Sequence, residues 1–153
     1  MDLTDVIAST ILMHFGGLHR VLRADIESLS DEALAWTPAP DTSSISTLVV
    51  HLLGSEGEAW NTIRGKPKER DRDGEFEGPA LAARELVGRI DQAERVLAEE
   101  APLITADDLG SMRPRPHRGQ TQSGLGWLLQ AFAHANEHYA QIRLTKQLYE
   151  QSR

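Results

Sequence analysis

Two histidines stand four residues apart in the segment FAHANEHYAQIRL, residues 132–144. In a helix, His134 and His138 project from the same side, about one turn apart. A neutral imidazole nitrogen is a good ligand for divalent transition metals, so this pair offers two ligands from one rigid element. A third ligand has to come from another part of the chain.

His51 is the candidate for the third ligand, because it interrupts the apolar run LVVHLL in a second helical segment. Metal sites in helical bundles are built from side chains at mid-length on facing helices. Three protein ligands leave a position for water or substrate, as in catalytic zinc sites. The alternative is that the histidines lie at the edge of the core and bond to the backbone or to water. Each histidine belongs to a set of residues that line one side of its helix, separated by four and three residues in turn. The two sets are Ser44, Leu48, His51, Ser55, Glu58 and Thr62 in one segment, and Trp127, Ala131, His134, His138, Gln141 and Thr145 in the other.

Two further polar residues in these sets are weak catalytic candidates. Gln141 could hydrogen-bond a metal-bound water or orient a histidine, and the alternative is a structural amide. Glu58 could act as a base if it turns inward, and the alternative is a solvated carboxylate on the rim. His14 and His19 flank the apolar stripe of the first helix, where we expect both to be satisfied locally.

Helical periodicity dominates the chain, and no segment shows the alternation of a strand. The four long helices expected are residues 3–29, 44–64, 79–100 and from 123 almost to the C-terminus. Ser30 is expected to cap a short turn, Gly65 to end the second helix and Pro79 to lie in the first turn of the third. The charged connection 66–78 is expected to be solvated. This pattern predicts an all-α four-helix bundle.

Residues 101–122 form the longest irregular stretch, and long loops of this kind tend to be functional or mobile. Arg113, Arg115 and Arg118 could clamp a substrate carboxylate, and the alternative is a mobile charged loop. His117 is expected to be solvated.

Composition excludes several functional classes. The 153 residues suit one domain, 1–153, and the formal charge of −7 argues against a nucleic-acid surface. Because cysteine is absent, thiol chemistry would need a sulfur that arrives with a substrate. Neither a signal peptide nor an apolar run of about 20 residues is evident, so we expect a cytoplasmic protein that is not inserted in a membrane.

Two blocks of the sequence resemble the DinB/YfiT-like superfamily. Residues 29–60, LSDEALAWTPAPDTSSISTLVVHLLGSEGEAW, contain a W-x-P turn followed by S-I-x-x-L-x-x-H-L. Residues 125–151, LGWLLQAFAHANEHYAQIRLTKQLYEQ, contain H-x-x-x-H followed by a glutamine and an aliphatic residue. The resemblance implies an up-down-down-up bundle, a metal site of His51, His134 and His138, and a homodimer.

The resemblance also implies a function. Members of this superfamily include transferases and isomerases that use low-molecular-weight thiols such as bacillithiol, mycothiol or glutathione. We therefore expect a metal-dependent thiol transferase that acts on a small-molecule substrate and uses a divalent transition metal, zinc or nickel in particular. Two alternatives stay open: a hydrolase that uses metal-bound water, and a non-catalytic, stress-related metal-binding module.

Overall fold

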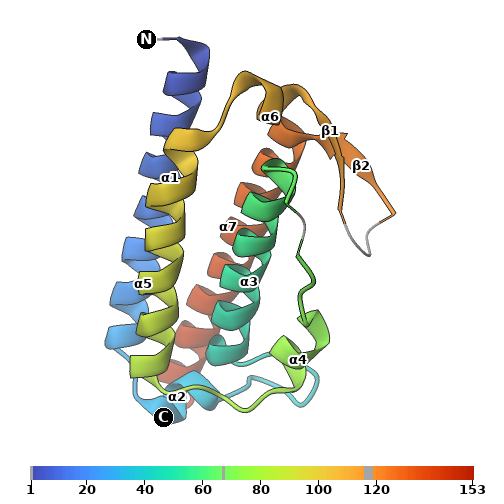
Figure 1. Cartoon of the computed structure of the whole chain (residues 1–153). Helices are drawn as coiled ribbons and strands as arrows, with labels where there is room; N and C mark the ends of the chain where they lie inside the picture. The colour runs from blue at the N-terminus through green and yellow to red at the C-terminus, as the bar shows by residue number, and fades with distance from the viewer. Residues whose placement is uncertain (1, 67, 116–118) are drawn as a thin grey trace.

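The computed structural model describes residues 2–66, 68–115 and 119–153. Its four long helices are α1 (Leu3–Glu27), α3 (Ile45–Ile63), α5 (Ala83–Glu100) and α7 (Gly124–Gln151). Helices α3 and α5 run in one direction, and α1 and α7 run in the opposite direction (Figure 1). The predicted all-α, up-down-down-up four-helix bundle is confirmed.

Side-chain caps explain where the helices of the site begin. The Ser44 hydroxyl accepts a hydrogen bond from the Thr47 backbone N–H at 3.1 Å, and Ser123 accepts one from Gly126 at the same distance. These bonds satisfy donors that the first turns of α3 and α7 leave unpaired. Gly65 adopts a φ of +65° directly after α3, as the predicted terminator requires. Ser30 caps the short α2 (Asp31–Ala35) in the same way.

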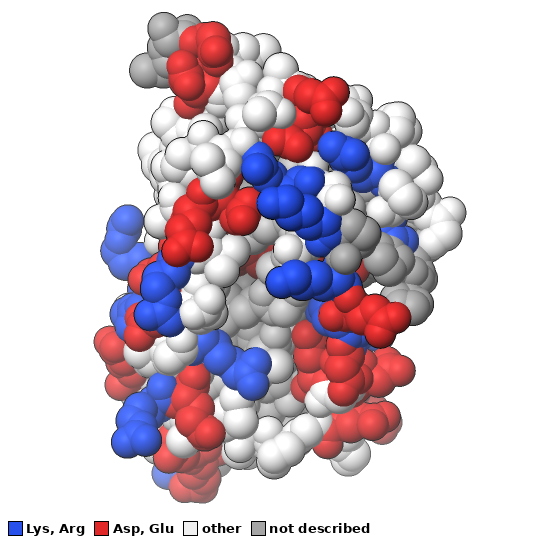
Figure 2. All heavy atoms as spheres, in the orientation of Figure 1, with Lys and Arg blue, Asp and Glu red and all other residues white. Residues whose placement is uncertain are grey.

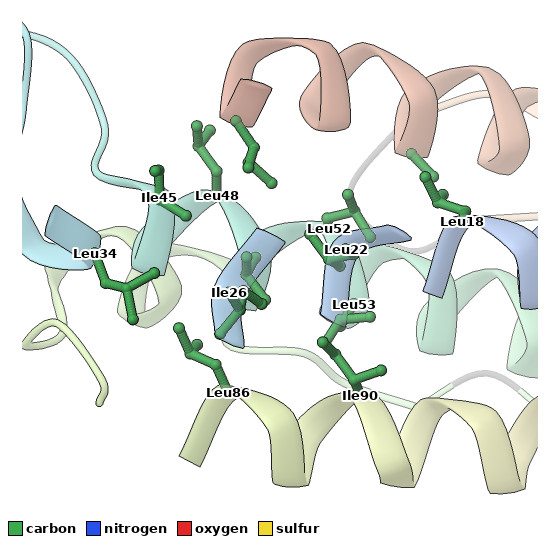
Figure 3. Packing of buried hydrophobic residues seen from close by; sticks show 13 residues of the cluster. Leu18, Leu22, Ile26, Leu34, Ile45, Leu48, Leu52, Leu53, Leu86 and Ile90 are labelled. Carbon is green, nitrogen blue, oxygen red and sulfur yellow. The ribbon is translucent and has the colours of Figure 1, made fainter. Parts of the chain in front are cut away.

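The core lies between the long helices, in two apolar clusters. In the first cluster, Leu22 and Ile26 of α1, Leu52 of α3, and Leu86 and Ile90 of α5 point toward one another (Figure 3). The second cluster surrounds aromatic side chains toward the other end of the bundle: Phe15, Trp60 and Trp127. Helix α3 packs against α7, α5, α2 and the short α4 (Arg72–Glu77), and it is therefore buried around most of its circumference.

Helix α5 begins later than predicted. Pro79 is not helical, because the segment before Ala83 is tied to other elements through its backbone. The Leu81 N–H donates to the Ser46 hydroxyl at 2.7 Å, and the Ala83 N–H donates to Asp31 at 2.9 Å. These bonds hold the segment extended against the bundle until α5 starts.

The two connections contain more regular structure than the sequence indicated. The first includes α4 (Arg72–Glu77), and the second includes the 3₁₀ turn η1 (Ala101–Leu103), α6 (Ala106–Gly110), and the antiparallel strands β1 (Met112–Pro114) and β2 (Thr121–Ser123). Strands of three residues are too short to show alternation. None of the described helices is both long enough and apolar enough to cross a bilayer.

Candidate metal centre

His51 lies at mid-length on α3, on the side that faces α7. Its residue exposure is 2%, and the rings of Phe76, His134 and His138 lie 4.6, 5.1 and 4.8 Å from its own ring. The Nε2 atom of His51 lies 3.3 Å from Nε2 of His134 on α7. The structure thus brings together histidines that are 83 residues apart in the sequence.

The other two imidazoles come from consecutive turns of α7. His134 and His138 approach each other with their Nε2 atoms 3.0 Å apart. One ring nitrogen from each of the three histidines lies within 4.8 Å of the others. Nitrogens bound at ~2.0–2.1 Å to one tetrahedral ion lie roughly 3.3 Å apart. The spacing of the three rings therefore fits a single divalent ion, and the group could hold one.

Hydrogen-bond partners assign the tautomers of two of these rings. Nδ1 of His51 lies 3.1 Å from the Glu75 carboxylate, and Nδ1 of His138 lies 2.9 Å from the Gln141 side-chain oxygen. Both partners are acceptors, so in the neutral rings Nδ1 carries the proton. The Nε2 lone pairs of His51 and His138 then point toward His134, and a bound cation would relieve their mutual repulsion.

Arg70 also approaches Nδ1 of His51, at 3.1 Å, but a guanidinium can only donate. Its Nη2 has better acceptors in Glu75 Oε1 at 2.6 Å and the His51 carbonyl at 3.3 Å. Burial raises the pKa of Glu75, but the hydrogen bonds from His51 and Arg70 outweigh it and leave that pKa below its ordinary value. Glu75 is therefore an ionised acceptor for His51 at neutral pH.

Helix α4 covers the outer side of His51. The Phe76 ring lies 4.6 Å from the His51 ring, and the Arg72 guanidinium lies 5.1 Å from the centre of the Phe76 ring. The prediction of a solvated connection over 66–78 holds for most of its described residues, which are exposed, but not for Arg70 and Glu75, whose side chains are largely buried. Acidic side chains gather on the outer surface around α4 (Figure 2), where Asp71, Asp73 and Glu77 are exposed and favour the approach of a cation.

Glu58 is neither a solvated rim carboxylate nor a free base. One of its oxygens accepts from Arg115 at 2.8 Å and the other accepts from Arg70 at 2.8 Å. Burial raises the pKa of Glu58, but these hydrogen bonds and charges outweigh it and hold the pKa below its ordinary value. A carboxylate with a lowered pKa and two guanidinium partners is a weak proton acceptor.

The remaining candidates lie in different surroundings. Gln141 is exposed and touches the site through Nδ1 of His138, an orienting contact. His14 is exposed and packs edge-on against Phe132. His19 is fully buried, and its Nε2 lies 2.8 Å from Glu56. In the described contacts, His14 and His19 lie away from the three-histidine group, but Nδ1 of His19 is buried without a hydrogen-bond partner, so the expectation that it is satisfied locally is only partly met.

The basic stretch of the second connection does not form an exposed clamp where the structure describes it. Arg115 is 4% exposed, donates to Glu58 and the Ser55 carbonyl, and lies 5.5 Å from the centre of the Trp127 ring. Arg113 approaches Asp108 at 3.8 Å. His117 and Arg118 lie outside the described residues.

The donor set decides which chemistry the group can support. Three neutral imidazoles without a thiolate suit a divalent transition metal. His134 and His138 are partly exposed, whereas His51 is buried, so the group is reached from the α7 side. If these three residues held an ion, access on one side would leave a coordination position for a water or a substrate atom.

Comparison with known proteins identifies the family and the fold of the chain. A family model for the DinB superfamily matches residues 15–142. A DinB-like protein from Bacillus subtilis superposes with a TM-score of 0.70 at 18% identity, over 94% of this chain and 92% of the other. One from Bacillus cereus superposes with a TM-score of 0.71 at 17% identity, over 93% and 90%. A search of curated proteins returns no significant match. The family match covers most of the chain, including all three histidines, and the chain belongs to the DinB superfamily.

Proposed function

We propose that this protein is a metal-dependent transferase that uses a low-molecular-weight thiol. One observation carries the proposal: Nε2 atoms of His51, His134 and His138 face a common point, and the two α7 histidines are partly exposed. In the proposal, these three residues hold one zinc or nickel ion. When bound, the ion would lower the pKa of a thiol or water that coordinates it.

The chain's own residues define the rest of the mechanism. Glu75 and Gln141 hold the rings of His51 and His138, so the ligand atoms need little reorganisation. The thiol sulfur then bonds to an electrophilic carbon of a small-molecule substrate, whose leaving group departs with the electron pair. The thiol proton passes to solvent. The nucleophilic sulfur belongs to the substrate, because the chain contains no cysteine.

Hydrolysis that relies on a carboxylate base beside the metal-bound water has less support. The two carboxylates connected to His51 in the described network are Glu75, directly, and Glu58, through Arg70, and both accept hydrogen bonds from arginine. The pKa of each lies below its ordinary value, which weakens it as a base. A thiol needs no such base, because its own pKa already lies close to neutrality.

Cobalt substitution tests the transferase proposal directly. The cobalt-loaded protein should develop a sulfur-to-metal charge-transfer band when bacillithiol, mycothiol or glutathione is added. His14→Ala is the matched control, because this exposed histidine lies on α1 and should leave the band unchanged. A cobalt-loaded protein that shows no band with any of the three thiols would contradict the thiol proposal. Retained activity toward a hydrolysable substrate would then favour the hydrolase.

A non-catalytic metal-binding module is the remaining alternative. Thermal melting with and without a chelator separates it from an enzyme, because a purely structural ion stabilises the fold outright. The extensive apolar core predicts that most of the stability survives metal removal. Collapse of the fold in chelator, together with a lack of thiol binding, would favour the structural role.

We also propose the homodimer that the family resemblance implies. Leu125 and Leu129 are exposed on α7 and, with Ile7 of α1, line an apolar groove of about 340 Å³. Exposed apolar surface of this kind supports association. Light scattering coupled to gel filtration should give twice the mass of the chain, and the mass of one chain at all concentrations would refute the dimer.

A further inference from the structure

Gly54 lies one turn after His51 on α3, and the Glu75 carboxylate occupies the space where its side chain would be. A Cβ atom at position 54 would lie 2.1 Å from Glu75 Oε2 and 3.0 Å from Glu75 Cδ. It would also lie 3.2 Å from Nε of Arg70. The close packing of this carboxylate on α3 therefore depends on the absence of a side chain at position 54.

The Glu75 carboxylate accepts three hydrogen bonds. Glu75 Oε1 accepts from His51 Nδ1 at 3.1 Å and from Arg70 Nη2 at 2.6 Å. Glu75 Oε2, the atom nearest to the missing Cβ, accepts from Arg70 Nε at 2.9 Å. The two bonds from Arg70 fix the plane of the carboxylate, and its remaining lone pair fixes the His51 ring.

We propose that Gly54 is a positioning residue of the metal centre. Because position 54 has no side chain, Glu75 can pack against α3 at this point. From there it holds His51 as the Nδ1–H tautomer, with Nε2 turned toward His134. The inference rests on the proposed metal site and deepens it, because it identifies what orients the ligand contributed by α3. Carboxylates that accept from the second nitrogen of a ligating histidine fix its tautomer and raise its basicity.

Helix propensity gives no reason for a glycine at this position. Glycine in a helix interior is less stable than alanine by roughly 0.5–1 kcal/mol. Helix α3 contains a second glycine, Gly57, and a Cβ atom there would meet nothing within 4 Å. Gly57→Ala is thus a matched control, with the same chemical change one turn along the same helix but no carboxylate to displace.

Substitution at position 54 should move Glu75 and leave α3 folded. The atoms that the new Cβ would meet first belong to the end of a flexible side chain and not to backbone. In Gly54→Ala we expect the carboxylate to swing away from α3 and to lose its bond to His51. Glu75→Gln weakens the same bond by a different route, because it keeps the shape of the side chain and one acceptor oxygen but removes the charge.

Zinc affinity, measured by competition with a chromophoric chelator, is the first readout. Gly54→Ala and Glu75→Gln should each bind zinc 10–100-fold more weakly than the wild type, the usual cost of losing such a partner. Gly57→Ala should match the wild type. In a Glu75→Ala background, Gly54→Ala should cause no further loss, because no carboxylate remains to be displaced. Equal affinities for Gly54→Ala and Gly57→Ala, or a further loss in the Glu75→Ala background, would overturn the inference.

Imidazole ¹H–¹⁵N spectra of the metal-free protein give a second readout that does not depend on metal binding. The wild type and Gly57→Ala should show His51 as the Nδ1–H tautomer, and Gly54→Ala should lose this signature. An unchanged His51 tautomer in Gly54→Ala would overturn the inference even if zinc affinity fell. A wild type that binds neither zinc nor nickel would instead refute the proposed function, and the spectra would still decide the role of Gly54.

Discussion

Replacing Glu58 with glutamine should destabilise the fold, because Glu58 neutralises a buried arginine. The side chain of Arg115 is 2% exposed, and its charge-assisted partner at 2.8 Å is Glu58, whose side chain is 13% exposed. Removing one partner of a buried ion pair costs about 3–5 kcal/mol. Arg70 keeps Glu75 as a partner at 2.6 Å, so we expect a loss near the lower end, about 3 kcal/mol.

Urea denaturation followed by circular dichroism measures this loss. With a slope of about 2 kcal/mol per molar urea, the unfolding midpoint of Glu58→Gln should fall by about 1.5 M. Glu32→Gln is the control, because Glu32 pairs with Arg153 at the same 2.8 Å while their side chains are 75% and 55% exposed. An exposed pair contributes about 0–1 kcal/mol, so its midpoint should barely move. Similar midpoints for the two variants would refute the assignment of Glu58 to a buried network.

The pH dependence of stability supplies an internal check on the same residue. The pKa of Glu58 is lower in the folded state than in the unfolded state. Its contribution to the free energy of unfolding is therefore complete above the unfolded-state pKa and disappears as the pH falls through the folded-state pKa. The difference between the wild type and Glu58→Gln should therefore shrink below about pH 4.5. A difference that stays constant down to acid unfolding would contradict the lowered pKa.

Three further predictions address other parts of the fold. Ser44→Ala removes the cap of α3 and should lower the free energy of unfolding by about 1 kcal/mol, measured in urea. Leu52→Ala leaves a cavity between α1, α3 and α5 and should cost about 2–5 kcal/mol in the same assay; a loss below 1 kcal/mol would contradict its full burial. Burial and the hydrogen bond to Asp25 raise the pKa of Tyr139 to about 12. Ultraviolet titration should therefore show one tyrosine ionisation near that pH, and this ionisation should be absent in Tyr139→Phe.

The convergence of the three histidines could be predicted because it follows from helix geometry. The spacing of four places His134 and His138 on one side of α7 whatever surrounds them. The position of His51 at mid-length on an apolar helix, together with the family resemblance, placed it opposite. Ser44 and Ser123 marked the starts of α3 and α7 through local capping chemistry, which needs no tertiary information.

The surroundings of the histidines could not be predicted, because tertiary contacts determine them. Glu75 is 24 residues from His51 in the sequence, within a charged segment that has the composition of a solvated loop. Only the return of α4 onto α3 brings the two together. Arg115 is 57 residues from Glu58, and its burial beside Trp127 overrides what its proline-rich, basic neighbours indicated. Gly54 gave no signal of its own, since its role depends on where Glu75 lies.

The central claim is that one metal ion is held by these three imidazoles. Elemental analysis of the purified protein, beside a variant with His51, His134 and His138 all changed to alanine, tests it most directly. We predict about one zinc or nickel ion per chain in the wild type, the same content in the His14→Ala control, and none in the triple variant. Equal metal content in the wild type and the triple variant would contradict the site and the function proposed for it.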